Sequence, residues 1–198
     1  MKVLGINCSP RKSQTTFYAL QSCLNALQEA QSNLATEIIE LADMNIQGCH
    51  ACGHCKESLA CSIKDDFMKL LSPLGDPDVK AIVIGTPVYL GTMTSQCKAF
   101  LDRSVMLKRN GSLFRNMVGG VLAIGGRRNG GQELTIQAVH AAMLCHDMLV
   151  VSDGMNTSHF GGTLYSGGDG GIEQDNNGLT TARNLGKRIA DVVTMLHK

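Results

Sequence analysis

Residues 81–85, Ala-Ile-Val-Ile-Gly, form a short, fully apolar run that constrains the fold more than any other segment. A strand without polar alternation is typical of a parallel sheet that helices cover on both faces. A similar strand, residues 3–8, opens the chain and stops at Ser9-Pro10. Because parallel strands need crossover connections, the sequence predicts strands that alternate with helices.

The alternation continues along the whole chain. Three further strands are expected at residues 37–41, 118–124 and 148–152. Apolar periodicity predicts helices at residues 16–28, 95–106, 132–146 and 179–196, and a shorter helix that Asp65 or Asp66 could cap. We therefore predict an α/β, flavodoxin-like, doubly wound sheet of five parallel strands in the order 2-1-3-4-5.

The length of 198 residues fits one domain, residues 1–198, better than two. The stretch at residues 161–178, rich in Gly, Ser, Asp and Asn, is expected to be a surface loop. A net charge of +1 does not provide the basic surface that nucleic-acid binding requires. The apolar runs are too short to span a membrane, and no secretory signal precedes the first strand, so we expect a cytoplasmic protein without membrane contact.

The loop after the first strand carries hydroxyl and basic side chains and opens a helix. Such a helix N-terminus offers free N–H groups and a positive dipole end, which suit a phosphate. The segment has no Gly-Lys-Ser/Thr ending and no GxGxxG turn, so a phosphate monoester fits it better than a dinucleotide. A plain helix cap is the alternative. The candidate phosphate ligands are Ser9, Arg11, Ser13, Thr15 and Thr16.

Two more loops follow strands and could hold a planar ring. In open α/β sheets, ligands bind outside the carboxyl ends of the strands. After the third strand come Pro87, Val88, Tyr89, Leu90, Gly91 and Thr92. After the fourth come Gly125, Gly126 and Arg127, in a glycine-rich turn that lets backbone N–H groups approach a ring. A phosphate end and two ring loops together indicate a mononucleotide such as FMN.

Four of the eight cysteines lie within thirteen residues, in a cysteine-rich loop at residues 48–62 that follows the second strand. In a reduced compartment such clusters more often hold metal or do redox work than form disulfides. Two residues separate Cys49 from Cys52 and Cys52 from Cys55, as in the ligand runs of [4Fe–4S] proteins. Structural zinc sites usually separate two CxxC pairs more widely. Zinc and an empty set of thiols remain alternatives. The candidate metal ligands are Cys49, Cys52, Cys55 and Cys61.

The other four cysteines, Cys8, Cys23, Cys97 and Cys145, are scattered along predicted strands and helices. Free cysteine is among the most frequently buried residue types and packs as a small hydrophobe. We therefore expect these four side chains in the core.

Four stretches together resemble the NADPH-dependent FMN reductase superfamily, and the compact cysteine motif resembles its iron–sulfur flavoproteins. They are the first-strand loop from Gly5 to Thr16, the four cysteines with residues 65–68, the Thr86–Tyr89 turn, and the Lys98–Arg103 segment. The resemblance implies one FMN per subunit and a [4Fe–4S] cluster near a neighbouring subunit's flavin. It also implies a homodimer or a dimer of dimers. The phosphate residues, the cluster residues and the ring residues 87–92 match its motifs, and Gly125, Gly126 and Arg127 lie where its third loop would be.

The resulting hypothesis is an oxidoreductase that passes electrons between FMN, the cluster and an external partner such as a ferredoxin, with NAD(P)H as a further reductant. The cofactors carry such chemistry, so we name no catalytic side chain. One alternative is an NAD(P)H-dependent FMN or quinone reductase without a cluster. Another is a non-catalytic flavodoxin-like module that senses redox state through its thiols.

Overall fold

The sheet is parallel throughout, and its order confirms the predicted topology. The computed structural model describes residues 1–198, and the strands follow the order β2-β1-β3-β4-β5, with β6 also paired to β4. The strands are β1 (Lys2–Asn7), β2 (Ala35–Glu40), β3 (Val79–Pro87), β4 (Val118–Gly125), β5 (Leu149–Val150) and β6 (Gly162–Tyr165). Strand order reverses at β1, so the carboxyl ends of β1 and β3 flank a topological switch point.

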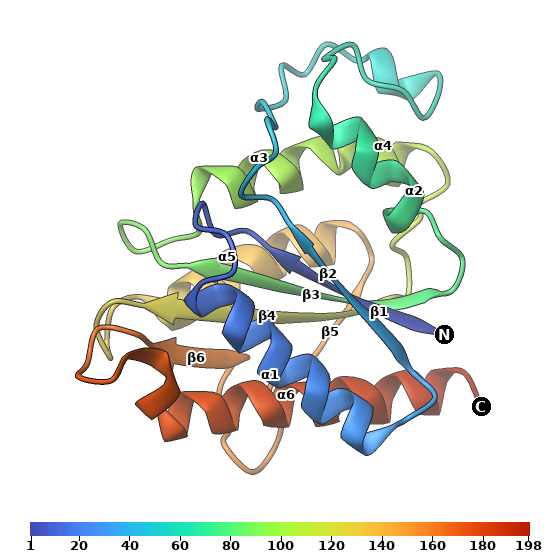
Figure 1. Ribbon diagram of the computed structural model, residues 1–198. Coiled ribbons are helices and arrows are strands. Elements are labelled where there is room, and N and C mark those ends of the chain that lie inside the picture. The colour runs from blue at the N-terminus through green and yellow to red at the C-terminus, as the bar shows by residue number, and fades with distance from the viewer.

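Helices cover both faces of the sheet (Figure 1). One face carries α1 (Thr15–Ala30) and α6 (Asn176–Leu196), and the other carries α2 (Leu71–Leu74), α3 (Ser95–Arg103), α4 (Val105–Arg109) and α5 (Gln132–Cys145). Three 3₁₀ turns lie at His54–Lys56, Asp66–Leu70 and Gly171–Gln174. None of the helices combines the length and the apolar character that a bilayer crossing requires.

The two layers of core side chains explain why β3 and β4 are apolar on both faces. Leu4, Ile82 and Phe100 belong to the buried cluster under α3 and α5. Val83 and Leu185 belong to the cluster under α1 and α6. A strand between two such layers has no solvent face, as the apolar run at residues 81–85 predicted.

Helices α1 and α6 approach each other at a glycine. A Cβ placed on Gly186 would lie 2.0 Å from the carbonyl oxygen of Cys23. Any side chain at this position would therefore force the two helices apart.

The fifth position of the sheet differs from the prediction. Strand β5 has only two residues and pairs with the amino-terminal half of β4, while β6 pairs with the carboxyl-terminal half, from Leu122 to Gly125. The expectation of a surface loop at residues 161–178 was therefore wrong. Gly162 and Leu164 are buried, because the free edge of β4 offers backbone partners there, and Ile172 is buried in the following 3₁₀ turn.

The predicted helix at residues 95–106 is two helices. It is interrupted at Ser104, whose hydroxyl donates to the carbonyl of Leu101 and lies 2.8 Å from Nε2 of His146. A buried side chain that bonds a backbone carbonyl in the preceding turn competes with the helical pattern. The chain bends there and continues as α4.

Candidate functional site

Three loops meet at the carboxyl edge of the sheet, on the left of Figure 1. The loops after β1 and β3 are joined because Thr94 Oγ1 donates to the carbonyl of Cys8 at 2.8 Å. The loops after β3 and β4 are joined because Val88 N donates to the carbonyl of Ile124 at 2.9 Å. The structure therefore brings the predicted phosphate loop and both predicted ring loops to one edge.

The first loop ends at an open helix N-terminus. Gln14 is the N-cap residue of α1, and no side chain caps the N–H groups of the first turn. The hydroxyl of Thr16 is buried and has no hydrogen-bond partner. A buried hydroxyl without a hydrogen-bond partner costs roughly 1–3 kcal/mol, so a ligand group that bonds the Thr16 hydroxyl would recover that energy. The free N–H groups and this hydroxyl fit a phosphate group.

Ser9 and Arg11 shape the start of the same loop. Ser9 is 2 % exposed, and its Oγ accepts the N–H of Arg11 at 3.1 Å. The guanidinium of Arg11 is exposed and enters no ion pair. Arg11 is therefore the free cation of this loop, because Lys12 pairs with Asp43 at 2.5 Å.

Glu40 was not predicted as part of the site, yet it fixes the loop. Its carboxylate accepts the Ser13 N–H at 2.8 Å, the Ser13 hydroxyl at 3.1 Å and Nδ2 of Asn7 at 2.9 Å. Ser13 has a φ of 51°, in the left-handed region, and these bonds hold it there. The exposed Ser13 side chain is thus already hydrogen-bonded to Glu40, whereas the buried Thr16 hydroxyl has no partner.

The second loop closes in a tight turn from Tyr89 to Thr92. The two residues exchange backbone hydrogen bonds of 2.8 and 3.2 Å, and Leu90 and Gly91 have φ values of 49° and 79°. This is the geometry of a type I′ turn, which is costly for leucine at the first central position. Leu90 is fully exposed and Tyr89 is half exposed, so the turn presents apolar surface to solvent.

The third loop is held from inside by Gln132. Its Nε2 donates to the carbonyls of Arg127 at 2.7 Å and Leu164 at 3.1 Å, and its Oε1 accepts the Gly130 N–H at 2.8 Å. Gln132 is buried, so these bonds are shielded from water. The side chain fixes the glycine turn on β6.

A second clamp on this loop is the carboxylate of Asp175. It pairs with Arg128, accepts the N–H of Tyr165 at 2.7 Å and caps α6 through the N–H of Gly178 at 3.0 Å. The Arg128 guanidinium also lies 5.3 Å from the centre of the Tyr165 ring. Arg128 is therefore engaged, and Arg127 is the exposed arginine of the loop without an ion pair.

The two ring loops touch each other. A Cβ placed on Gly131 would lie 3.1 Å from the Cα of Gly91. Gly131 has a φ of 98°, which other residues rarely adopt. The two glycine turns therefore form one continuous rim beside the phosphate loop.

The cysteine segment, residues 48–62, lies over α3 and α4, at the top of Figure 1. Cys49 and Cys52 are exposed, Cys61 is partly exposed and Cys55 is buried. No three His, Cys, Asp or Glu side chains of the structure lie close enough to hold one metal ion. The four predicted ligands therefore lie in one segment, but their sulfur atoms do not surround a common point.

The surroundings of these thiols favour negative charge. Nη1 of Arg109 lies 3.2 Å from Sγ of Cys55. The Ser62 hydroxyl, 3.2 Å from Sγ of Cys52, lowers the pKa of that thiol, and a backbone N–H of His54 and the charge of Arg109 act in the same direction. Thiolates are the form that binds metal. The donor set and its cationic neighbours therefore fit an iron–sulfur cluster in chemistry and charge.

A buried ion pair anchors the end of the segment. Asp65 and Arg103 have side chains that are 0 % and 1 % exposed. Burial alone would raise the pKa of Asp65, but the hydrogen bonds from Arg103 and from the backbone of Gln47 and Phe67 hold it below its usual value. Arg103 also donates to the Gln47 carbonyl at 3.1 Å, so one guanidinium fixes both ends of the segment.

The prediction for the remaining cysteines is correct for three of them. Cys8, Cys23 and Cys97 are buried, and burial raises the pKa of Cys23 to about 12. Cys145 is exposed, which corrects the expectation of a core position. It is the last residue of α5 and lies on the exposed face of the helix, while Met143 and His146 beside it are buried.

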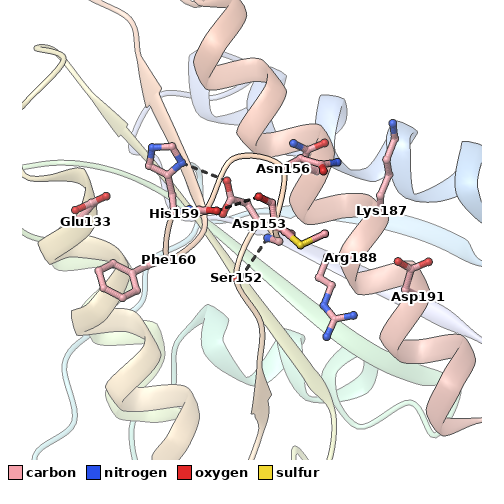
Figure 2. Close-up of a pocket in the computed structure, with 13 residues that line it drawn as sticks. Glu133, Ser152, Asp153, Asn156, His159, Phe160, Lys187, Arg188 and Asp191 are labelled. Carbon is pink, nitrogen blue, oxygen red and sulfur yellow. Dashed lines mark hydrogen bonds and ion pairs between the residues drawn. The ribbon is translucent and has the colours of Figure 1, made fainter.

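A polar groove of about 810 Å³ lies between α5, α6 and the loop from β5 to β6 (Figure 2). The buried carboxylate of Asp153 accepts the backbone N–H of His159 at 2.7 Å and fixes that loop. Lys187 and Arg188 project from α6. The groove also contains the carboxylates of Glu133 and Asp191, so charges of both signs line it and favour no class of ion. The sequence did not predict this groove, because its residues come from three distant segments.

Comparisons with known proteins identify the family of the chain. Residues 1–162 match the family model of the NADPH-dependent FMN reductases. The chain is 44 % identical over 198 residues to an iron–sulfur flavoprotein of Methanocaldococcus jannaschii, with all of both chains covered. It is 36 % identical over 198 residues to an iron–sulfur flavoprotein of Methanosarcina thermophila, with 100 % of this chain and 98 % of the relative covered.

Among solved structures, a WrbA-like flavodoxin from Agrobacterium tumefaciens superposes with a TM-score of 0.61 at 20 % identity, covering 100 % of this chain and 98 % of that one. The fold is therefore flavodoxin-like, and the family match with the curated relatives shows a flavin oxidoreductase. The chain belongs to the NADPH-dependent FMN reductase family and, within it, to the iron–sulfur flavoproteins.

Proposed function

We propose that this protein binds FMN at the carboxyl edge of its sheet and exchanges electrons between the flavin, a [4Fe–4S] cluster and an external partner. The observation that carries the flavin site is the open N-terminus of α1 with the unpartnered buried hydroxyl of Thr16. A phosphate there would receive helix N–H groups, this hydroxyl and the charge of Arg11. Ser9 and Ser13 would keep the loop in shape around it.

The two ring loops would hold the flavin ring. Pro87, Val88, Tyr89, Leu90, Gly91 and Thr92 supply one wall, and Gly125, Gly126 and Arg127 supply the other. Exposed backbone N–H groups of the glycine turn would bond the polar edge of the ring. The Arg127 guanidinium, which is free of ion pairs, would stabilise negative charge at that edge.

The four cysteines Cys49, Cys52, Cys55 and Cys61 would hold the cluster. When bound, FMN accepts electrons singly or as hydride, and a [4Fe–4S] cluster passes them singly. Arg109 would offset negative charge of the cysteinate ligands, since it contacts Cys55 and has no carboxylate partner, whereas Arg103 is already paired with Asp65. We infer that the external partner is a ferredoxin-like protein, with NAD(P)H as an additional reductant.

We further infer a homodimer or a dimer of dimers in the cytoplasm. The support for assembly is the turn at Leu90. Its side chain is fully exposed and its backbone is left-handed, so a costly conformation presents apolar surface outward. Costly conformations of this kind cluster at functional sites, and an apolar side chain held outward is available to a second copy of the chain.

Spectroscopy of protein purified without oxygen tests the cofactors. We expect flavin absorption bands, four irons per chain and an EPR signal of a reduced [4Fe–4S] cluster. Cys52→Ser should lose iron, and Cys145→Ser, which changes an exposed thiol outside the ligand set, should keep it. Stoichiometric zinc without iron would contradict the cluster, and absence of flavin would contradict the FMN site.

A further inference from the structure

The end of α4 holds Cys55, one of the four predicted cluster ligands, at two of its atoms. Nη1 of Arg109 donates to Sγ of Cys55 at 3.2 Å, and Nδ2 of Asn110 donates to the Cys55 carbonyl at 2.9 Å. The same amide nitrogen donates to the carbonyl of Met106 at 2.8 Å, which ties it to its own helix. Two consecutive side chains of one element therefore fix both the sulfur and the backbone of Cys55.

Cys55 differs from the other three predicted ligands in its surroundings. It is 9 % exposed, whereas Cys49 and Cys52 are exposed and Cys61 is partly exposed. It also belongs to the buried cluster under α3 and α5. Water screens a charge less at the edge of a core than at the surface, so the bond from Arg109 to Cys55 has more electrostatic weight than a solvated contact.

The four cations of α3 and α4 differ in their partners. Lys98 and Arg103 form ion pairs with carboxylates. Lys108 donates to a backbone carbonyl and has no carboxylate partner. Arg109 also lacks a carboxylate partner, and it bonds the sulfur of Cys55. Its charge is therefore available to a cysteinate, as a charge-assisted hydrogen bond.

We propose that Arg109 sets the reduction potential of the iron–sulfur cluster by donating a hydrogen bond to the cysteinate of Cys55. The inference rests on the proposed function, because it requires the cluster. Reduction of a [4Fe–4S] cluster by one electron adds a negative charge, and hydrogen bonds to the ligand sulfurs tune its potential. A cation on a ligand sulfur stabilises the reduced form more than the oxidised form, so Arg109 raises the potential.

Arg109 is a positioning residue in this scheme, since it acts through Cys55. The electron comes from the flavin or from the external partner of the proposed function, and no bond to the protein forms or breaks. A raised potential makes the cluster easier to reduce. Arg109 therefore governs how readily an electron enters the protein at the cysteine segment.

A reductive titration of protein purified without oxygen, with dithionite and redox mediators, tests the proposal. The EPR signal of the reduced cluster reports the ratio of reduced to oxidised protein at each potential. In Arg109→Met this ratio should fall about tenfold at a fixed potential, which corresponds to a midpoint about 59 mV lower for one electron. Arg109→Lys keeps the charge without the planar guanidinium and should lie between Arg109→Met and the natural protein.

The matched control is Lys108→Met. It removes the same charge one residue earlier, from an exposed side chain that donates to a carbonyl rather than to a sulfur. Its ratio should shift by less than about threefold, since water and salt screen an exposed charge. Iron content and circular dichroism are measured for every variant.

An iron-loaded Arg109→Met with the potential of the natural protein would overturn the proposal. Equal shifts in Arg109→Met and Lys108→Met would overturn it in favour of general surface charge, and loss of iron from both Arg109 variants in favour of a role in holding the cluster. If Arg109→Met alone loses iron, an Arg109→Lys potential equal to the natural one overturns it. Absence of iron from the natural protein contradicts the proposed function together with this inference, whereas an iron-loaded protein whose potential is independent of Arg109 contradicts this inference alone.

Discussion

Arg103 and Asp65 form a bidentate ion pair that is closed to solvent. Nη1 donates to Oδ2 at 2.7 Å and Nη2 donates to Oδ1 at 3.0 Å. The Arg103 guanidinium also lies 4.9 Å from the centre of the Phe67 ring. The pair joins α3 to the end of the cysteine segment, so the stability of the core and the position of the thiols depend on one contact.

Arg103→Met should destabilise the protein strongly. It leaves the buried Asp65 carboxylate with its backbone hydrogen bonds but without a countercharge, and breaking a buried ion pair typically costs about 3–5 kcal/mol. The measurement is the free energy of unfolding by denaturant, and the matched control is Arg115→Met, an exposed arginine outside any ion pair. A loss below about 1 kcal/mol, the range of exposed ion pairs, would show that the pair does not anchor the segment.

The same pair predicts a pH dependence. The pKa of Asp65 is lowered in the folded protein. The contribution of this carboxylate to the free energy of unfolding is therefore complete above its usual pKa of about 3.9, and it is lost as the pH falls through the folded pKa. Unfolding free energies of the natural protein and of Asp65→Asn should therefore differ most near neutral pH and converge in acid. A difference that stays constant from neutral pH to strong acid would contradict this assignment.

Asp175→Ala should loosen the third loop and weaken FMN binding. The change removes the partner of Arg128, the acceptor of the Tyr165 N–H and the N-cap of α6, and loss of a cap alone costs about 1 kcal/mol. Fluorescence titration of FMN measures the affinity. Asp169→Ala, an exposed aspartate four residues after Tyr165, should behave like the natural protein. Equal affinities for the two variants would show that the clamp does not position the ring.

The positions of strands and helices could be predicted from the sequence wherever burial of one or both faces produced a regular apolar pattern. The run at residues 81–85 lies within β3, because a strand buried on both faces leaves an unbroken apolar signal. Strand β6 was missed because only four residues pair there, and Gly162 gives no strand signal. Its formation depends on the free edge of β4, which is a tertiary effect.

Placement of the loops at one edge followed from topology, but the contacts inside them did not. Ser13 reads in sequence as one more hydroxyl of the phosphate loop, yet it bonds Glu40, which lies at the end of β2. Arg128 and Arg127 are adjacent in sequence, and only the former meets Asp175. Partners separated by 27 and 47 residues leave no local signal in a single sequence.

The central claim is that the open end of α1 receives the phosphate of FMN, and Thr16→Val tests it most directly. The variant keeps the shape of the side chain and removes only the unpartnered hydroxyl. We predict that the flavin-free protein keeps or gains stability, since no internal hydrogen bond is lost, while the FMN dissociation constant rises roughly tenfold or more. Unchanged FMN affinity in Thr16→Val, measured by fluorescence titration, would contradict the account.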